Sequence, residues 1–358
     1  MGLLDNMHAT RRPQSRIAGL GSFLPERVVC NAELSSLVIC PDEALRQSLP
    51  RYIEALTGIR NRRWANRNES PSLLAAKAGQ AALDASGLAK ADIDTLIFAA
   101  TDTDHIEPAT ANVVQDHLGM GAVNAFDVKC ACNSVLQAML VMDSLIATGA
   151  CRKGLIVSGE IGSHWANLNI RDRKDLDVKL GGLTLGDGGA AIVLERSDDE
   201  RGLLEFNLRS LPDSWRFCHI PHNTDWRNRP EESIMGWFYL DLASLAKMVK
   251  EYVPSYCREY AAYRKSQFGE ACFADKMHYL IPHQISERLI RLLCSETRIP
   301  MARTAVTADR YGNTGATSIP IALDEAISQG QISHGSGQEI ILFGAASGFA
   351  IGHVRVRM

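Results

Sequence analysis

The chain has 358 residues and a mass of 39.2 kDa, a length that allows about two domains or two structural halves. Its hydrophobic fraction of 46% and its charged fraction of 22% are typical of a soluble globular protein, which excludes a disordered, collagen-like or coiled-coil chain. The net charge of −3 gives no reason to expect nucleic acid or an anionic membrane surface as a partner.

The nine cysteines are odd in number and irregularly spaced, unlike those of a small secreted disulfide scaffold. The first residues lack the apolar stretch of a signal peptide. No run reaches the roughly 18 consecutive apolar residues that a membrane span requires. We therefore expect a reduced, cytoplasmic protein without a membrane span, in which most cysteines are small buried hydrophobes.

Strands and helices alternate along the first half. A strand is expected over 16–24. A helix is expected from Pro71, with Ser70 as its capping residue, to just before Gly87. Apolar runs predict further strands, and apolar segments with helical spacing predict further helices. These strands cover 93–100, 125–128, 154–158 and 189–195, and these helices cover 108–117 and 133–148.

The second half repeats this alternation after the charged turn 196–201, with an irregular polar insertion over 212–236. Strands are expected over 203–211, 276–281, 339–343 and 351–357, and helices over 240–264, 286–295 and 318–329. Alternating strands and helices predict a layered α/β fold. The strand and polar turn at 93–103 match those at 276–286 in kind, which suggests two duplicated halves, 16–196 and 203–358.

Cys132 is the first candidate for chemistry, because ligands in such folds gather beyond the carboxyl ends of strands. It stands between a short strand and an apolar helix. Unpaired N–H groups at a helix N-terminus favour a thiolate and can hold an oxyanion. A buried structural cysteine is the alternative. With Cys130 it also makes a pair that fits a redox or metal site, although no further ligands follow at a set spacing.

Three more polar residues lie at expected strand ends or helix starts. His283, in PHQIS, is either a satisfied polar residue or a base or donor that faces a cleft. Asn313, in the glycine-rich YGNTGATS, is by itself a turn residue. Glu107 precedes Pro108 and is by itself a solvated carboxylate at a helix start. The C-terminal turn lacks the glycine spacing of a dinucleotide site, but it offers backbone N–H donors.

Taken together, six segments resemble, in order and spacing, the ketoacyl-ACP synthase III group of the thiolase superfamily. They are TGIRNRR at 57–63, AFDVKCAC at 125–132, LTLGDGGAAIVL at 183–194, PHQIS at 282–286, YGNTGATS at 311–318 and FGAASGFAIG at 343–352. The resemblance runs from about residue 16 to 358 and implies a five-layer αβαβα fold of two duplicated halves, usually in a homodimer. It implies no metal and no cofactor, because the CoA or phosphopantetheine thioester is the substrate.

The resemblance also implies roles for single residues in an acyltransferase of fatty acid or polyketide biosynthesis. Cys132 would take an acyl group from an acyl-CoA or from an acyl carrier protein, because a thiolate makes a transferable thioester. His283 and Asn313 would hydrogen-bond the carbonyl of the second thioester and stabilise its enolate. The backbone N–H groups of Cys132 and Ser347 would form the oxyanion hole for acyl transfer. A Claisen condensation would then give a β-ketoacyl product.

The segment before TGIR departs from the housekeeping pattern. A tryptophan and an arginine that clamp the CoA adenine in that pattern are replaced here by Tyr52 and Leu56. Tyr52, Thr57 and Arg60 remain the candidate substrate-binding residues. Arg60, Arg62 and Arg63 would together offer a basic patch to a CoA phosphate or an acidic carrier.

Glu107 is a second departure, because the housekeeping enzymes usually have an apolar residue there. A glutamate before Pro108 resembles the branch that joins two acyl chains head to head in olefin synthesis, or that forms pyrones. In that branch the glutamate reaches across the dimer as general base. A malonyl donor makes its own carbanion by losing CO₂, whereas a donor without that carboxylate needs a base. An apolar pocket would strengthen this base by raising its pKa.

Two other classes of protein are weighed against the enzyme. One is a catalytically silent partner subunit of a condensing complex, which is disfavoured because Cys132, His283 and Asn313 are all retained. The other is a redox protein that uses Cys130 and Cys132.

Overall fold

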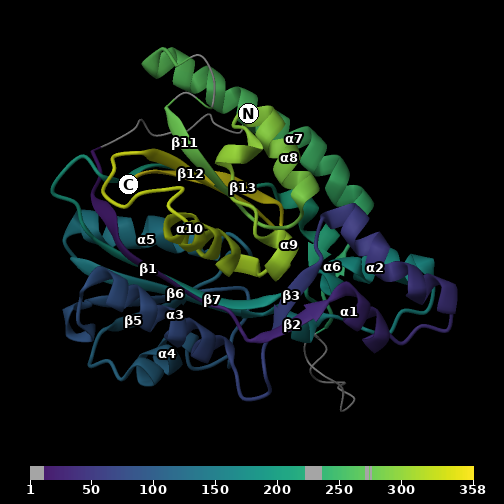
Figure 1. The fold of residues 1–358 in the computed structure, drawn as a ribbon. Coiled ribbons are helices and arrows are strands. Elements are labelled where there is room, and N and C mark those ends of the chain that lie inside the picture. Colours follow the sequence, from purple (N-terminus) through teal and green to yellow (C-terminus); the bar gives the residue numbers. More distant parts are fainter. Residues whose placement is uncertain (1–11, 222–235, 271–273, 275) are drawn as a thin grey trace.

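The computed structural model describes residues 12–221, 236–270, 274 and 276–358 (Figure 1). Its first sheet has five strands, in which β1 and β6 run antiparallel to β7, and β4 is parallel to both β6 and β5. Across the sheet the order is β1 (Ser15–Phe23), β7 (Asp187–Arg196), β6 (Lys153–Ile161), β4 (Thr95–Ala99) and β5 (Asn124–Val128).

The second sheet repeats this order in the second half of the chain. Its strands are β8 (Gly202–Ser210), β13 (Ala350–Arg357), β12 (Glu339–Ala346) and β11 (Met277–Pro282), taken from the edge that corresponds to β1. A single bridge between Leu280 and Thr304 lies where β5 lies in the first sheet. The same strand order in both sheets is the duplication that the sequence predicts.

Helices cover both sheets and fill the space between them (Figure 1). Helices α3 (Pro71–Ser86) and α4 (Thr110–Leu118) lie on the outer face of the first sheet, and α7 (Leu242–Phe268) and α8 (Glu287–Thr297) lie on the outer face of the second. Between the sheets lie α5 (Ser134–Thr148) and α10 (Ser318–Ser328). These are the five layers of the predicted αβαβα fold. None of the helices in the described residues is long and apolar enough to cross a bilayer.

Several elements were not expected from the sequence. They are β2 (Arg27–Cys30), α1 (Asn31–Leu37), α2 (Glu43–Thr57), β3 (Asn61–Trp64), α6 (Arg173–Leu183), β9 (Cys218–His219), β10 (Tyr239–Leu240) and α9 (Ala308–Tyr311). Helix α2 contains Pro50, a residue that disfavours a helix interior, so its sequence did not predict a continuous helix. The predicted irregular insertion 212–236 includes β9, and its residues 222–235 lie outside the described part.

Helix α3 packs closely against the first sheet. The Ser70 side chain accepts the N–H of Leu73, and Gly87 ends the helix with φ of 70°, as predicted from capping preferences. A methyl group on Gly159 of β6 would overlap the carbonyl oxygen of Pro71. Only glycine allows so close an approach of strand and helix. This contact holds the carboxyl end of β6 against α3, and the next residue of the strand is Glu160.

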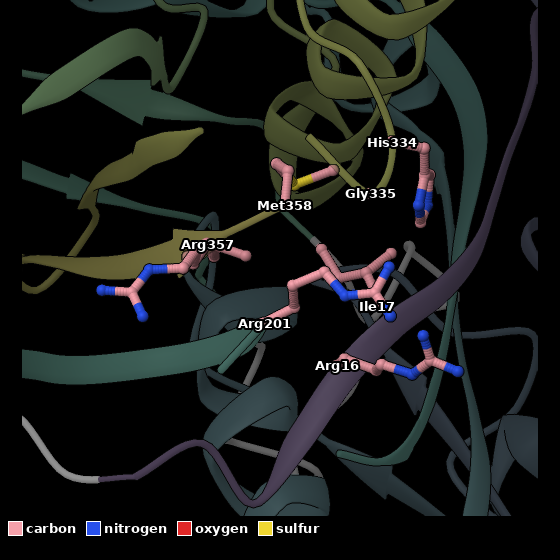
Figure 2. Close-up of a pocket in the computed structure, with 8 residues that line it drawn as sticks. Arg16, Ile17, Arg201, His334, Gly335, Arg357 and Met358 are labelled. Atoms are coloured by element: carbon pink, nitrogen blue, oxygen red, sulfur yellow. The ribbon is translucent and has the colours of Figure 1, made fainter. Parts of the chain in front are cut away.

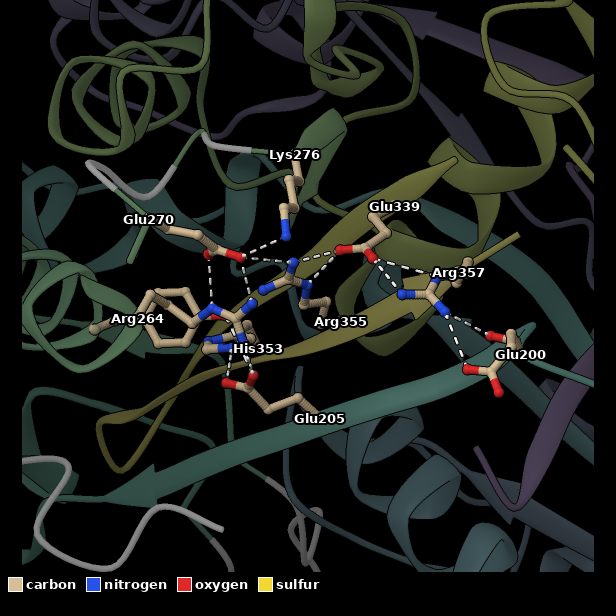
Figure 3. Close-up of polar contacts among 10 residues, drawn as sticks. Glu200, Glu205, Arg264, Glu270, Lys276, Glu339, His353, Arg355 and Arg357 are labelled. Atoms are coloured by element: carbon tan, nitrogen blue, oxygen red, sulfur yellow. Dashed lines mark hydrogen bonds and ion pairs between the residues drawn. The ribbon is translucent and has the colours of Figure 1, made fainter. Parts of the chain in front are cut away.

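The outer helix α7 is joined to the second sheet by a buried ionic network (Figure 3). The Arg264 guanidinium lies 2.7 Å from Glu270 Oε1 and 3.3 Å from Glu205 Oε2. His353 Nε2 lies 3.3 Å from Glu205, and Arg355 binds Glu339. Buried charges are costly unless they are paired, so the network favours one placement of α7 over the sheet.

Candidate active site

The turn between β5 and α5 presents Cys132 immediately before the helix. Ala131 has φ of 47°, in the left-handed region that non-glycine residues rarely adopt. The Ser134 hydroxyl accepts the N–H of Cys130 (2.8 Å) and lies 2.7 Å from the carbonyl oxygen of Ala131. The turn that carries Cys132 is therefore held in an unusual conformation at the start of α5.

Cys132 lines a cavity of about 380 Å³. Asn313 and Ser347, both from the second half of the chain, line the same cavity. Its walls also carry large apolar side chains, which are Trp165, Leu185, Trp215, Ile220 and Phe238. A pocket with apolar walls and a few polar groups suits an apolar chain that ends in a reactive carbonyl.

His283 follows the buried strand β11 and is only 3% exposed. It is not among the residues that line the large cavity. Its Nδ1 lies 2.5 Å from the Ser318 hydroxyl, which itself accepts the N–H of Gln284 (3.4 Å). The Ser318 hydroxyl can donate to Nδ1, an arrangement that would place the ring proton on Nε2. This buried Nε2 has no hydrogen-bond partner in the described part of the chain. Burial lowers the pKa of His283 to about 3, so the ring is neutral at pH 7.

Asn313 lies in the loop between α9 and α10 and is held by its backbone. Its N–H donates to the Thr184 carbonyl (2.9 Å), and its carbonyl accepts the N–H of Gly186 (3.0 Å). Its side-chain Oδ1 accepts the N–H of Gly315 (3.1 Å). Because Oδ1 is used as an acceptor, the Nδ2 amide group is the part of this side chain that can donate a hydrogen bond to a substrate.

A second thiol shares the cavity with Cys132. Cys218, from the insertion, lines the cavity, and its Sγ lies 3.0 Å from the Ser347 hydroxyl. Nothing in the sequence around Cys218 marks it, because the contact forms between segments 129 residues apart. Burial raises the pKa of both the Cys132 and Cys218 thiols. In the unliganded chain, burial therefore opposes the expected preference for a thiolate at the start of α5.

Two buried carboxyl groups lie beside the cavity. Glu160, at the end of β6, lines it, and Asp102 follows β4. Burial raises the pKa of Glu160 to about 7, against the effect of its hydrogen bonds. Burial, followed by the charge of Glu160, raises the pKa of Asp102 to about 8. Asp102 lies in the polar turn predicted to follow the strand over 93–100, whereas Glu160 was not expected to be a site residue.

Glu107 lies on the loop between β4 and α4, where it is exposed and does not line the cavity. Its neighbour Ile106 is 87% exposed. Within one chain the structure therefore does not bring Glu107 to Cys132. A role for Glu107 requires another subunit, as the resemblance implies.

The expected substrate-binding residues also lie away from the cavity lining. The Tyr52 ring lies under the Arg173 guanidinium, 4.1 Å from it. The Thr57 hydroxyl donates to the Ile53 carbonyl (2.6 Å) in the last turn of α2. Arg60 is exposed and pairs with Asp309 (2.8 Å).

Arg62 corrects the expected basic patch. It is fully buried, and its guanidinium donates to the Val29 carbonyl (3.2 Å) and to Asn31 Oδ1 (2.7 Å). Including Arg62 in a surface patch was therefore wrong. Successive strand residues point to opposite faces, and Arg62 is the residue of β3 that points inward.

A second hollow, of about 20 Å³, lies beside basic residues at the start of β1 (Figure 2). Strand pairing places Arg16 level with the first residue of β6, at the end of the sheet opposite Glu160. The guanidinium groups of Arg16 and Arg201 are paired with Glu195 and Asp199. This hollow is separate from the Cys132 cavity, and its charges are largely balanced.

Comparison with known proteins identifies the family. Residues 126–212 match the family described as 3-oxoacyl-[acyl-carrier-protein (ACP)] synthase III, and residues 272–358 match its C-terminal family. The β-ketoacyl-[acyl-carrier-protein] synthase III of Roseiflexus sp. (strain RS-1) is 33% identical over 341 residues, which cover 95% of this chain and 97% of the relative. The chain belongs to the 3-oxoacyl-ACP synthase III family.

Other members of the synthase III family are similarly close. The β-ketoacyl-[acyl-carrier-protein] synthase III of Methylococcus capsulatus is 31% identical over 349 residues, covering 96% of this chain and 98% of the relative. The crystal structure of the Aquifex aeolicus synthase III has a TM-score of 0.80 and 28% identity, covering 96% and 100% of the two chains.

OleA from Xanthomonas campestris shares the fold, with a TM-score of 0.82 at 22% identity and coverage of 98% and 100%. Membership of the synthase III family makes this chain an acyltransferase that forms a carbon–carbon bond by Claisen condensation, and its fold is the thiolase fold of these enzymes.

Proposed function

We propose that Cys132 of this condensing enzyme accepts an acyl group from an acyl-CoA or an acyl carrier protein and passes it to a second thioester. The observation that carries the proposal is the shared cavity, in which Cys132 from the first half meets Asn313 and Ser347 from the second. In the first step the Cys132 sulfur attacks the carbonyl carbon of the acyl thioester. The thiol of CoA or of the carrier protein's phosphopantetheine leaves and takes up the proton of the cysteine.

The condensation step would use neutral hydrogen-bond donors. Loss of CO₂ from a malonyl donor, or removal of an α-proton, would make the enolate of the second thioester, held by Nε2 of His283 and Nδ2 of Asn313. Its α-carbon then attacks the acyl carbonyl carbon on Cys132, the C–S bond breaks, and the Cys132 sulfur leaves as a thiolate. The low pKa of His283 and its unpartnered Nε2 support this role, because a neutral imidazole with a free N–H is a donor. The backbone N–H groups of Cys132 and Ser347 are proposed for the oxyanion hole. No metal or further cofactor is needed for these steps.

An intact-mass experiment with peptide mapping tests Cys132. Wild-type enzyme incubated with a panel of acyl-CoA and acyl-carrier thioesters should gain one acyl group on the peptide that contains Cys132. The Cys132→Ala variant should gain none, because the nucleophile is absent. Cys130→Ala, in the same turn, is the matched control and should be acylated like the wild type. An acyl group that persists on this peptide in Cys132→Ala would refute the proposal.

A condensation without decarboxylation is the second candidate, with Glu107 as the base from a partner subunit. Exposed Glu107 and Ile106 side by side favour it, because a subunit interface would cover both. The edge strand β5, which pairs with β4 alone among the described strands, supports a homodimer formed at this side of the molecule. We further propose that the enzyme is cytoplasmic and that Tyr52, Thr57 and Arg60 take part in substrate binding.

Glu107→Ala separates the two condensations. The variant should acylate Cys132 at the wild-type rate, because Glu107 is absent from the Cys132 cavity of its own chain. With a donor that has no α-carboxylate, its condensation should fall by about 100-fold or more, within the range expected for loss of a general base. With a malonyl donor it should be unchanged. Wild-type condensation rates with the first kind of donor would rule out the base role.

A further inference from the structure

Three backbone N–H groups converge on the carboxylate of Glu160. Oε1 accepts from Thr101 (2.7 Å) and from Ala316 (3.2 Å), and Oε2 accepts from Asp102 (3.2 Å). The side chain is only 1% exposed and lies at the wall of the Cys132 cavity. A buried carboxylate with this set of donors is a strong link between the segments that supply them.

One of those segments carries Asn313. Ala316 lies in the short turn Gly315–Thr317, and the N–H of Gly315 donates to Oδ1 of Asn313 (3.1 Å). Gly315 has φ of 58°, and a methyl group there would lie 3.0 Å from Glu160 Cδ. Glu160 therefore contacts Gly315, which donates to the Asn313 side chain, and accepts a hydrogen bond from the adjoining Ala316.

The other segment is linked to Cys132. Thr101 and Asp102 follow Ala100, whose carbonyl oxygen lies 3.2 Å from the Ser134 hydroxyl. That hydroxyl also binds the Cys130 N–H, in the turn that presents Cys132. A continuous series of contacts thus runs from the Cys132 turn, through the end of β4 and Glu160, to the Asn313 loop.

We propose that Glu160 is a positioning residue for the condensation step, which holds the Asn313 loop of one half in register with the Cys132 turn of the other. The inference rests on the function proposed above. Glu160 acts through Asn313, so it should matter after the enzyme has been acylated. Acylation itself uses the Cys132 turn, which Ser134 also holds.

Glu160→Gln tests the need for a carboxylate. Glutamine has the same shape, but its NH₂ group would face an N–H donor, so one hydrogen bond is replaced by a clash of donors. We expect acylation of Cys132, followed by intact mass, at the wild-type rate. The condensation kcat should fall by about 100-fold with little change in KM, as expected for a small misplacement of a reacting group. Equal losses in both steps, or an unchanged kcat, would overturn the inference.

Ser158→Ala is the matched control. Ser158 lies on the same strand, is equally buried, and its hydroxyl has no hydrogen-bond partner in the described residues. Its replacement should leave both steps at wild-type rates. If Ser158→Ala lowers the condensation kcat as much as Glu160→Gln does, the effect belongs to β6 in general and the inference fails.

A double-mutant cycle tests whether Glu160 works through Asn313. On the Asn313→Ala background, Glu160→Gln should cause little further loss of condensation, because coupled residues are not additive. Losses that multiply would mean that Glu160 acts independently of Asn313 and would overturn the inference.

Glu160→Asp decides the question if Glu160→Gln does not fold, as judged by thermal unfolding. Aspartate keeps the carboxylate but withdraws it by one methylene from the Ala316 amide. Selective loss of condensation would support the inference, and equal loss of acylation would contradict it. A wild-type enzyme that is never acylated at Cys132 would instead defeat the proposed function, whatever the Glu160 variants do.

Discussion

The polar side chains around Cys132 lie in a site where burial shifts their pKa values. It raises those of the Cys132 thiol and the Asp102 and Glu160 carboxyl groups, and it lowers that of His283. Each shift favours the neutral form of the group. Apart from Glu160, whose pKa of about 7 lets it ionise near neutral pH, these groups are therefore uncharged in the free state, which suits an apolar acyl chain and neutral donors.

Asp102 gives this effect a measurable consequence for stability. Its pKa rises from 3.8 to about 8 on folding, so the fold is most stable below about pH 4 with respect to this group and loses stability as pH rises toward 8. Asp102→Asn cannot ionise. Between pH 5 and 8 the free energy of unfolding should therefore shift in favour of the variant, by at most about 1.4 kcal/mol per pH unit. Denaturant unfolding at both pH values measures the shift.

Asp175 provides the opposite case for comparison. Its hydrogen bond with Arg171 lowers the pKa of the carboxyl group, so Asp175 is ionised in both states over this range. The difference in unfolding free energy between Asp175→Asn and the wild type should stay constant from pH 5 to pH 8. A constant difference for Asp102→Asn as well would contradict the buried-acid argument.

Among single residues, those within a local motif were predictable and those defined by distant contacts were not. Cys132 and Asn313 stand in recognisable segments, and the structure brings both to one cavity. Cys218 and Glu160 line the same cavity. Their significance depends on Ser347 and Ala316, which lie more than 100 residues further along the chain.

At the level of elements, the contact between β6 and α3 leaves no room for a side chain. Gly159→Ala would force the new methyl group into the Pro71 carbonyl, and such overpacking costs about 1–3 kcal/mol or more. Gly121→Ala is the control, since no atom lies within 4 Å of the added group. Chemical unfolding should show a large loss of stability for the first variant and little for the second. Equal stabilities would mean that α3 moves freely away from the sheet.

The long apolar strands and the capped helices were predictable because burial on both faces leaves a continuous apolar run, and caps leave a local signature. The strand over 93–100 is β4, and the helix that begins at Pro71 is α3. Helix α6 was not predicted because its last turn contains Gly181 and Gly182, and glycine disfavours a helix. Both glycines are buried, so packing against neighbouring segments rather than helix propensity explains their place.

Over the whole molecule, the two halves share one apolar core. A single cluster of buried residues contains Ile97 and Met139 of the first half together with Ile319, Leu342 and Val354 of the second. Chain length alone allowed two independent domains, because length carries no information about which surfaces meet. The shared core predicts that neither half is stable without the other.

Calorimetry checks this prediction. Thermal unfolding should give one transition, with the calorimetric enthalpy equal to the van't Hoff enthalpy. The physical reason is that helices α5 and α10 lie between the two sheets and are covered by both. Unfolding of either sheet would expose the apolar side chains of these helices and so destabilise the other sheet. Two separate transitions would show that the halves unfold independently.

The placement of Cys218 beside Ser347 has a consequence for covalent inhibitors. An electrophilic compound that enters the cavity meets two sulfur atoms, one on Cys132 and one on Cys218. Adducts on Cys132 and Cys218, with none on the exposed Cys30, would then report reaction inside the cavity rather than indiscriminate alkylation. A compound with two electrophiles of suitable spacing could bridge both sulfurs, and this selectivity would be lost in synthases that have only the nucleophilic cysteine.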